Sequence, residues 1–264
     1  MFAFRVEEIK MSRLSEVFLK RKALITFITA GDPSLSATEK LIYDLEKSGA
    51  DIIELGIPFS DPLADGPVIQ ASHQRALKKD VSLSEVFKLV SRARKKTQVP
   101  LCFMLSYNLI VNHGIEKFYV DCEKFGVDGA IVPDLPPEEE SQVAGRRSQV
   151  NNIYLVAPTS TDERIKLVAE KVSGFIYLIS VAGITGKRQA LAENLPDLVS
   201  RIKKYSQLPI AVGFGISTPA QAAEAARIAD GVIVGSAIVD LIAKKKMKAI
   251  PRFVSSLRKA IDAG

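Results

Sequence analysis

Short apolar runs rich in β-branched residues recur about every 20 to 30 positions along this chain, and they restrict its fold more than any other feature. None of the runs has the strict alternation of apolar and polar residues that marks a half-exposed antiparallel strand. Continuous apolar runs suit parallel strands that are covered on both faces. There are eight such runs, at residues 23–29, 51–55, 99–105, 129–132, 153–157, 175–180, 209–212 and 231–234.

Helical patterns lie between the runs, and several open with a recognisable N-terminal signal. In a capping box, a Ser or Thr and an acidic residue three positions later satisfy amides that the helix itself leaves free. A proline at the first helical position is a second signal of the same kind. The signals are Ser36 with Glu39, Ser82 with Glu85, Ser160 with Glu163, and Thr218 followed by Pro219.

An extra helix is expected at residues 11–20, where Leu14, Val17 and Phe18 share one face that can close the bottom of a barrel. Eight strand–helix units predict an α/β protein: a (β/α)8 TIM barrel formed as a single domain by the whole 264-residue chain, with another extra helix after strand eight. A doubly wound open sheet is the competing architecture. It would usually carry a glycine-rich dinucleotide turn after its first strand, and the Gly-Asp-Pro at 31–33 is not such a turn.

Composition excludes several classes of function. The net charge of +6 is scattered, and the densest basic run, at 244–248, is interpreted as a solvated helix end, so no nucleic-acid partner is expected. Cys102 and Cys122 lie in apolar or amphipathic segments and are expected in the core. The isolated His73 and His113 have no neighbours at metal-ligand spacing, so no metal is expected.

No segment of the sequence has the pattern of a signal peptide or of a membrane-spanning helix, so no membrane association is expected. The default location is the bacterial cytoplasm. A plastid is the alternative if a transit peptide has been removed.

Glu54 stands at the end of the second apolar run, and the C-terminal ends of the strands form the active-site face of a barrel. Burying a carboxylate there is costly unless it is paired, solvated or protonated, so Glu54 is a candidate catalytic group with a perturbed pKa. The stretch 56–67 that follows contains three prolines and two glycines and has no regular period, which is typical of a functional loop. Asp61 and Asp65 lie on this loop and either can cap a turn, so spacing alone does not decide which one faces Glu54.

Glycines gather where a barrel often binds phosphate. Gly213 and Gly215 follow the seventh run, and Gly235 with Ser236 follows the eighth. The loops at these places commonly bind phosphate because glycines let the backbone approach and the first amides of a helix point toward the anion. The Gly-Ile-Thr-Gly stretch after the sixth run can add a third wall. Glycines also make tight turns, but this placement favours a small phosphorylated substrate.

The loop after the second run carries a family resemblance. The stretch Glu54-Leu-Gly-Ile-Pro-Phe-Ser-Asp-Pro-Leu-Ala-Asp65-Gly-Pro resembles the signature of the tryptophan synthase α subunit family and is highly specific to it. Further matching segments follow the family order over nearly the whole chain. They are Phe27-Ile-Thr-Ala-Gly-Asp-Pro33, Val132-Pro-Asp-Leu-Pro136, Gly213-Phe-Gly-Ile-Ser217 and Gly235-Ser-Ala-Ile238.

The resemblance implies a carbon–carbon lyase of L-tryptophan biosynthesis, which splits indole-3-glycerol phosphate into indole and glyceraldehyde 3-phosphate by a retro-aldol reaction. It implies no cofactor in this chain. It also implies a β-subunit partner, which uses pyridoxal phosphate to join channelled indole with serine in an α2β2 heterotetramer.

For the site, the resemblance implies that Glu54 shuttles protons and that Asp65 holds the indole N–H, which resolves the choice between the two loop aspartates. Thr185 would contact Asp65 when the loop after the sixth run closes. The other positions are Phe27, Ile69, Leu105, Tyr107, Ile131, Tyr177, Thr185 and Phe214 for the substrate, Gly186, Gly215, Gly235 and Ser236 for its phosphate, and Pro58 and Asp61 for contact with the partner.

One departure and three alternatives stay open. Some family members carry an arginine or another polar residue where Val181 or Ala182 stands, which bears on loop closure and partner signalling rather than on the reaction. The alternatives are a free-standing indole-3-glycerol phosphate lyase, a non-catalytic regulatory partner of a β subunit, and a sugar-phosphate isomerase or epimerase on the same fold. A vestigial site would have lost Glu54, Asp65 or the glycines, and all are present.

Overall fold

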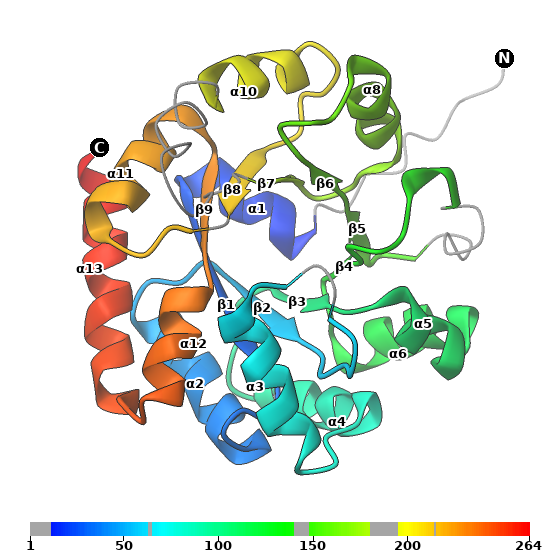
Figure 1. The fold of residues 1–264 in the computed structure, drawn as a ribbon, viewed down its shortest axis with the longest axis vertical. Coiled ribbons are helices and arrows are strands. Elements are labelled where there is room, and N and C mark those ends of the chain that lie inside the picture. The colour runs from blue at the N-terminus through cyan, green and yellow to red at the C-terminus, as the bar shows by residue number, and fades with distance from the viewer. Residues whose placement is uncertain (1–11, 63–64, 140–147, 180–194, 214) are drawn as a thin grey trace, which may run out of the picture.

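The computed structural model describes residues 12–62, 65–139, 148–179, 195–213 and 215–264. Its strands form one parallel sheet that curls into a nearly closed barrel, and helices surround it (Figure 1). Nine strands are found in this part of the chain: β1 (Ala23–Thr29), β2 (Ile52–Gly56), β3 (Leu101–Met104), β4 (Gly129–Ile131), β5 (Asn151–Ile153), β6 (Leu155–Val156), β7 (Ile176–Ile179), β8 (Ile210–Gly213) and β9 (Gly231–Val234).

The fifth expected strand is divided in two, which explains why nine strands stand where eight runs were predicted. β5 pairs with β4, with Ile153 opposite Ile131, and β6 pairs with β7, with Leu155 opposite Tyr177. Tyr154 lies between them, and its carbonyl accepts a hydrogen bond from the Tyr177 N–H at 3.0 Å. β5 and β6 together therefore fill one strand position between β4 and β7, and the (β/α)8 barrel prediction is confirmed.

Helices follow most strands, and both expected extra helices, α1 and α12, are present. None of the described helices is both long and apolar enough to cross a membrane. They are α1 (Arg13–Lys20), α2 (Leu35–Lys47), α3 (Pro67–Leu77), α4 (Leu83–Ala93), α5 (Tyr107–His113), α6 (Ile115–Phe125), α8 (Asp162–Lys171), α10 (Leu195–Lys203), α11 (Pro219–Ile228), α12 (Ser236–Ala243) and α13 (Ile250–Ala263), with short 3-10 turns at Pro137–Glu139 and Met247–Ala249.

Two of the four predicted helix starts are confirmed. Ser82 forms the expected capping box with Glu85, and Thr218 forms one that closes on Gln221.

The other two starts were placed wrongly. α2 is capped by Ser34 rather than Ser36, because residue 34 has the extended backbone that an N-cap needs and its hydroxyl accepts from the Ala37 N–H. α8 is capped by Thr161, because the Ser160 hydroxyl is engaged with the Ala157 N–H instead.

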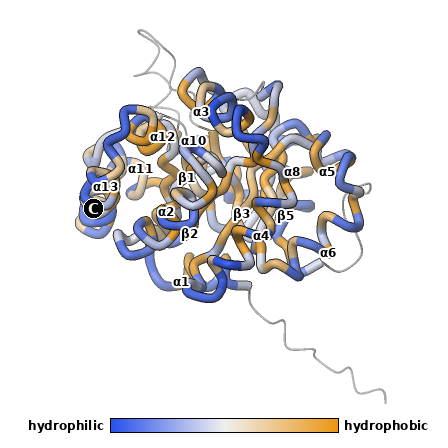
Figure 2. The backbone as a smooth tube through the Cα atoms, turned by 90° about the horizontal axis from the view of Figure 1, so that it is seen from below, coloured by the Kyte–Doolittle hydropathy of each residue, from blue (hydrophilic) through white to orange (hydrophobic). Residues whose placement is uncertain are grey.

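The strands are buried on both faces, which is why their sequences are continuously apolar. Alternate residues such as Ile25, Ile52 and Phe175 fill the inside of the barrel. Their neighbours, such as Leu24 and Ile53, pack outward against the helices. In Figure 2 the apolar colour is accordingly concentrated within the barrel and the polar colour on the outer helices. Both cysteines are buried and free, as expected.

Helix α1 closes one end of the barrel, which confirms the predicted plug. Leu14 is fully buried within the inner cluster, and the ring of Phe18 lies 5.6 Å from that of Phe175. In Figure 2, α1 and α3 lie at opposite ends of the molecule. The end that carries α3 is therefore the open, C-terminal end of the strands.

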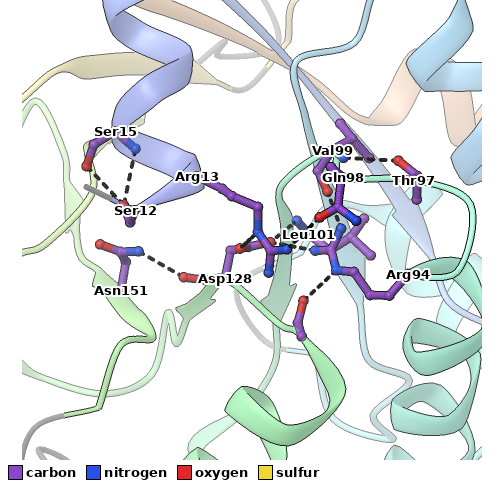
Figure 3. A network of polar contacts seen from close by, with 11 residues as sticks. Ser12, Arg13, Ser15, Arg94, Thr97, Gln98, Val99, Leu101, Asp128 and Asn151 are labelled. Atoms are coloured by element: carbon purple, nitrogen blue, oxygen red, sulfur yellow. Dashed lines mark hydrogen bonds and ion pairs between the residues drawn. The ribbon is translucent and has the colours of Figure 1, made fainter. Parts of the chain in front are cut away.

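The closed end is held by aspartates that stand just before a strand. The Asp128 N–H donates to the Leu101 carbonyl and the Leu101 N–H donates back to Asp128 Oδ2, both at 2.8 Å. Arg13 and Arg94 approach the same carboxylate at 2.6 and 2.5 Å, so the charge is paired on both oxygens (Figure 3).

This arrangement recurs at two other strand starts. Asp51 exchanges the same pair of hydrogen bonds with Leu24, and Asp230 does so with Ile210. Three pairs of neighbouring strands are therefore locked in register at the end of the barrel away from the open face.

Candidate active site

Glu54 lies on β2 with its side chain inside the barrel, two residues beyond the inward-facing Ile52. The residue is fully buried, and neither carboxyl oxygen has a hydrogen-bond partner in the described structure. Burial raises the pKa of Glu54 from its ordinary value of 4.5 to about 8. At neutral pH the resting group is therefore mostly a neutral acid.

Asp65 ends the loop after β2, and its side chain is 21% exposed. Its backbone is fixed, because the Asp65 N–H donates to the Pro62 carbonyl and the Gln70 side chain donates to the Asp65 carbonyl. The carboxylate Oδ2 lies 3.2 Å from Nε2 of His73 on α3. Asp65 is thus held in place at the mouth of the barrel.

Two adjoining cavities open at this face, and they share the lining residues Phe27, Asp65 and Met104. The larger, about 270 Å³, lies between the loops after β2, β3 and β4. The smaller, about 100 Å³, lies between Tyr177, the loop after β8 and the start of α12. Of the two loop aspartates, Asp65 lines both cavities and Asp61 only the larger one.

The smaller cavity has the features of an anion site. Gly215, Gly235 and Ser236 line it, and Gly235 is the N-cap of α12. The first amides of a helix have no acceptor within that helix, so those of α12 are available to an anion. Among the described lining residues there is no lysine or arginine, so backbone amides and the Ser236 hydroxyl are the groups that can hold a phosphate here.

Tyr177 links the anion site to the two carboxyl groups. Tyr177 lines the smaller cavity and is almost wholly buried. The pKa of the Tyr177 phenol is raised well above its ordinary value, first by burial and then by the charges of Glu54 and Asp65. The charges of both acids therefore act on the Tyr177 phenol, and Asp65 lines the same cavity as Tyr177.

The structure brings together most of the predicted site residues that it describes. Glu54 is fully buried on β2, Tyr107 begins α5, Ile131 lies in the inner cluster and Pro58 is buried, and none of these four lines either cavity. Thr185, Gly186 and Phe214, with Val181 and Ala182, lie outside the described residues. The predicted residues that line a cavity are Phe27, Asp61, Asp65, Ile69, Leu105, Tyr177, Gly215, Gly235 and Ser236.

Several lining residues were not predicted. Met104 and Ile233 stand at or near the C-terminal ends of β3 and β9, and that position in a strand was the signal that could have found them. His73 lines the larger cavity and contacts Asp65, although its sequence surroundings gave no hint of a site. Asp134 also lines this cavity and accepts hydrogen bonds from Ser106 and the Tyr107 N–H.

The fold and these cavities define a class of protein: a β/α-barrel enzyme with a buried carboxyl group and, at the C-terminal ends of its strands, a cavity beside the N-terminus of a helix. The comparison with known families makes this specific. The family model described as tryptophan synthase alpha chain matches residues 15–260, and the chain belongs to that family.

Relatives from the same family match this chain over almost their full length. The tryptophan synthase alpha chain of Geotalea daltonii is 49% identical and the match covers 96% of this chain and 99% of the relative. That of Dehalococcoides mccartyi is 47% identical, with 96% and 100% covered.

Solved structures give the same result. The subunit alpha from Legionella pneumophila superposes with a TM-score of 0.86 at 38% identity, covering 96% of this chain and all of the other. A structure of Mycobacterium tuberculosis tryptophan synthase gives a TM-score of 0.88 at 36% identity, covering 97% and 100%.

Proposed function

We propose that this chain is the lyase subunit that splits indole-3-glycerol phosphate into indole and glyceraldehyde 3-phosphate, with Glu54 as proton shuttle and Asp65 as anchor of the indole nitrogen. The single observation that carries the proposal is the state of Glu54. Its carboxyl group is fully buried at the C-terminal end of β2 without a hydrogen-bond partner, and this burial raises its pKa to about 8.

A neutral acid at this position suits the first step of a retro-aldol cleavage. Glu54 donates its proton to the ring carbon that bears the glycerol chain, which leaves a positive charge on the ring nitrogen. The resulting Glu54 carboxylate then takes the proton of the adjacent glycerol hydroxyl as the carbonyl forms. The carbon–carbon bond breaks, its electron pair returns to the ring and neutralises the nitrogen, and Glu54 regains its starting state.

Asp65 has the complementary role. As a carboxylate it accepts a hydrogen bond from the ring N–H and stabilises the positive charge that develops there, and the partial exclusion of water strengthens this interaction. The phosphate of the substrate would lie on the amides at Gly215, Gly235 and Ser236. Phe27, Ile69 and Tyr177 supply the apolar wall that an indole ring requires.

The reaction needs no cofactor in this chain. The partner is the tryptophan synthase β subunit, whose pyridoxal phosphate joins indole with serine, and the expected assembly is an α2β2 heterotetramer. Asp61 is exposed beside the larger cavity and is the more accessible of the two proposed partner contacts, since Pro58 is buried. The relatives named above come from bacteria, which supports the bacterial cytoplasm as the location.

Indole release from indole-3-glycerol phosphate tests the proposal, measured with Glu54→Gln and Asp65→Asn, each alone and with a β subunit. Glutamine keeps the shape of Glu54 but neither gives nor takes a proton, so turnover should fall by at least about 100-fold while the fold is kept. Near-normal turnover by Glu54→Gln would remove the assignment.

The same assay separates the alternatives. Stimulation of the wild-type chain by the β subunit supports the α-subunit role, and an unchanged high rate would indicate a free-standing lyase. Activation of the β subunit without any indole release would indicate a regulatory partner. Turnover of an indole-free sugar phosphate instead would indicate an isomerase or epimerase.

A further inference from the structure

His73 joins the two ends of the loop that carries Asp65. It lies on α3, its residue is only 4% exposed, and both of its ring nitrogens face that loop. Nδ1 accepts a hydrogen bond from the Phe59 N–H at 3.2 Å, and Nε2 lies 3.2 Å from Asp65 Oδ2. One imidazole therefore spans the loop from its beginning to its end.

The hydrogen bond from the Phe59 N–H selects the tautomer of the ring. Because Nδ1 accepts from a backbone amide, its lone pair is in use and the proton of the neutral imidazole is on Nε2. Nε2, which carries that proton, is the ring atom that lies against Asp65 Oδ2, at 3.2 Å.

Helix α3 is itself tied to β1 and to the loop after β1, so the imidazole is held on a rigid support. The hydroxyls of Ser72 and Thr29 are 2.5 Å apart in the core. Arg75 makes two hydrogen bonds to the buried carboxylate of Asp32, at 2.9 and 2.7 Å. Residues on both sides of His73 are thereby anchored, which fixes the backbone from which the ring extends.

We propose that His73 is a positioning residue for the lyase reaction: it holds Asp65 Oδ2 so that the other carboxylate oxygen faces the ring N–H of the substrate. This rests on the proposed role of Asp65. Catalysis is sensitive to such placement, because a reacting or stabilising group displaced by about 1 Å can lose most of its effect. The residue acts through Asp65 and need not touch the substrate.

Two near-isosteric variants separate the two contacts of the ring. In His73→Gln the terminal amide can take the place of Nε2 and donate to Asp65. In His73→Asn the shorter side chain can accept from Phe59 but cannot reach Asp65. We expect His73→Gln to stay within about 3-fold of wild-type kcat/KM, and His73→Asn to lose about 10- to 100-fold, the worth of one hydrogen bond to a charged group.

The loss should be in kcat rather than KM, because the charge on the ring nitrogen develops only in the transition state. The matched control is His113→Gln. His113 is the other histidine of the chain and pairs with Asp121 and Lys117 away from both cavities, so this variant should match wild type. A loss in His73→Gln beside a wild-type rate for His73→Asn would overturn the proposal, because the ring would then act by holding Phe59. Equal losses in the two variants would also overturn it, because the contact with Asp65 would then make no separate contribution.

A double-mutant cycle with Asp65 distinguishes failure of this inference from failure of the proposed function. If His73 acts through Asp65, His73→Asn should change the rate of Asp65→Asn by less than about 3-fold. Normal turnover by Asp65→Asn would remove the proposed role of Asp65 itself. A slow Asp65→Asn beside a wild-type rate for His73→Asn would leave that role intact and overturn the role of His73.

Discussion

At the scale of single residues, a carboxyl group without hydrogen-bond partners costs a folded protein free energy whenever it ionises. Glu54 is such a group. Its position suits proton transfer, but the fold would tolerate an apolar or amide side chain there at a lower cost. The free energy of unfolding should therefore depend on pH because of Glu54.

The direction of this pH dependence follows from the pKa of Glu54, which is about 8 in the folded protein and ordinarily 4.5. Below pH 4.5 both states hold the proton. Between the two values the unfolded state loses it first, so the free energy of unfolding falls as pH rises, and above about 8 the loss is complete.

Glu54→Gln removes this dependence. From about pH 5 to 8, the stability of the variant relative to wild type should rise by roughly 2 to 4 kcal/mol, as measured by denaturant unfolding. Glu224→Gln, at an exposed position on α11, should follow the wild-type curve. Parallel curves for Glu54→Gln and wild type would mean that Glu54 is not held neutral.

Gly56 gives a second prediction at this scale. A Cβ added there would lie 2.5 Å from Cζ of the Phe27 ring, which lines both cavities. Gly56→Ala should therefore push this ring out of place, lower stability by about 1 to 3 kcal/mol and raise KM for the substrate. Gly66→Ala, where no atom lies within 4 Å of the new methyl group, should lose less than about 1 kcal/mol, the difference between glycine and alanine at the N-cap of α3, and should leave Phe27 in place.

Residues differ in how far the sequence could predict them. Glu54 could be placed because a strand end is a position that periodicity reveals. The choice between Asp61 and Asp65 could not be made from spacing, because it depends on how the irregular loop folds back on α3. The contacts of His73 with Phe59 and Asp65 depend on the path of the same loop, so no local sequence pattern could predict them.

At the scale of elements, the paired aspartates before β2, β4 and β9 fix the register of the barrel. Register must be set somewhere, because a shift by one residue would exchange the inward and outward faces of a strand.

Strand five shows what the apolar pattern leaves undetermined. The run 153–157 predicted one strand, but only pairing with β4 and β7 reveals the change of partner at Tyr154.

Asp128 should be the costliest of these aspartates to replace. Its side chain is only 6% exposed and is paired with Arg13 and Arg94, so Asp128→Asn leaves buried positive charge without a counter-ion. We expect a loss of about 3 kcal/mol or more in chemical denaturation.

Asp230→Asn is the matched control. Its side chain is 31% exposed, and its lysine partners are 3.7 and 3.8 Å away, so the loss should stay below about 1 kcal/mol. Equal losses at the two positions would show that the backbone hydrogen bonds, rather than the buried charges, carry the effect.

At the scale of the whole molecule, the barrel separates stability from chemistry. The cavities and both proposed catalytic acids belong to the C-terminal ends of the strands, while α1 and the arginine–aspartate contacts close the opposite end. The two ends appear apart in Figure 2, with α3 on one and α1 on the other. A defect at the closed end should therefore lower the free energy of unfolding without altering the reaction.

Two leucines of α1 test this separation. Leu14 is fully buried against the floor of the barrel, and Leu19, on the same helix, is 74% exposed. Leu14→Ala should cost about 2 to 5 kcal/mol because it leaves a cavity among packed side chains. Leu19→Ala should change stability by less than about 0.5 kcal/mol. Both should keep wild-type kcat and KM at temperatures where they remain folded. A fall in kcat for folded Leu14→Ala would show that helix α1 also influences the site, through the side chains packed inside the barrel between Leu14 and Glu54.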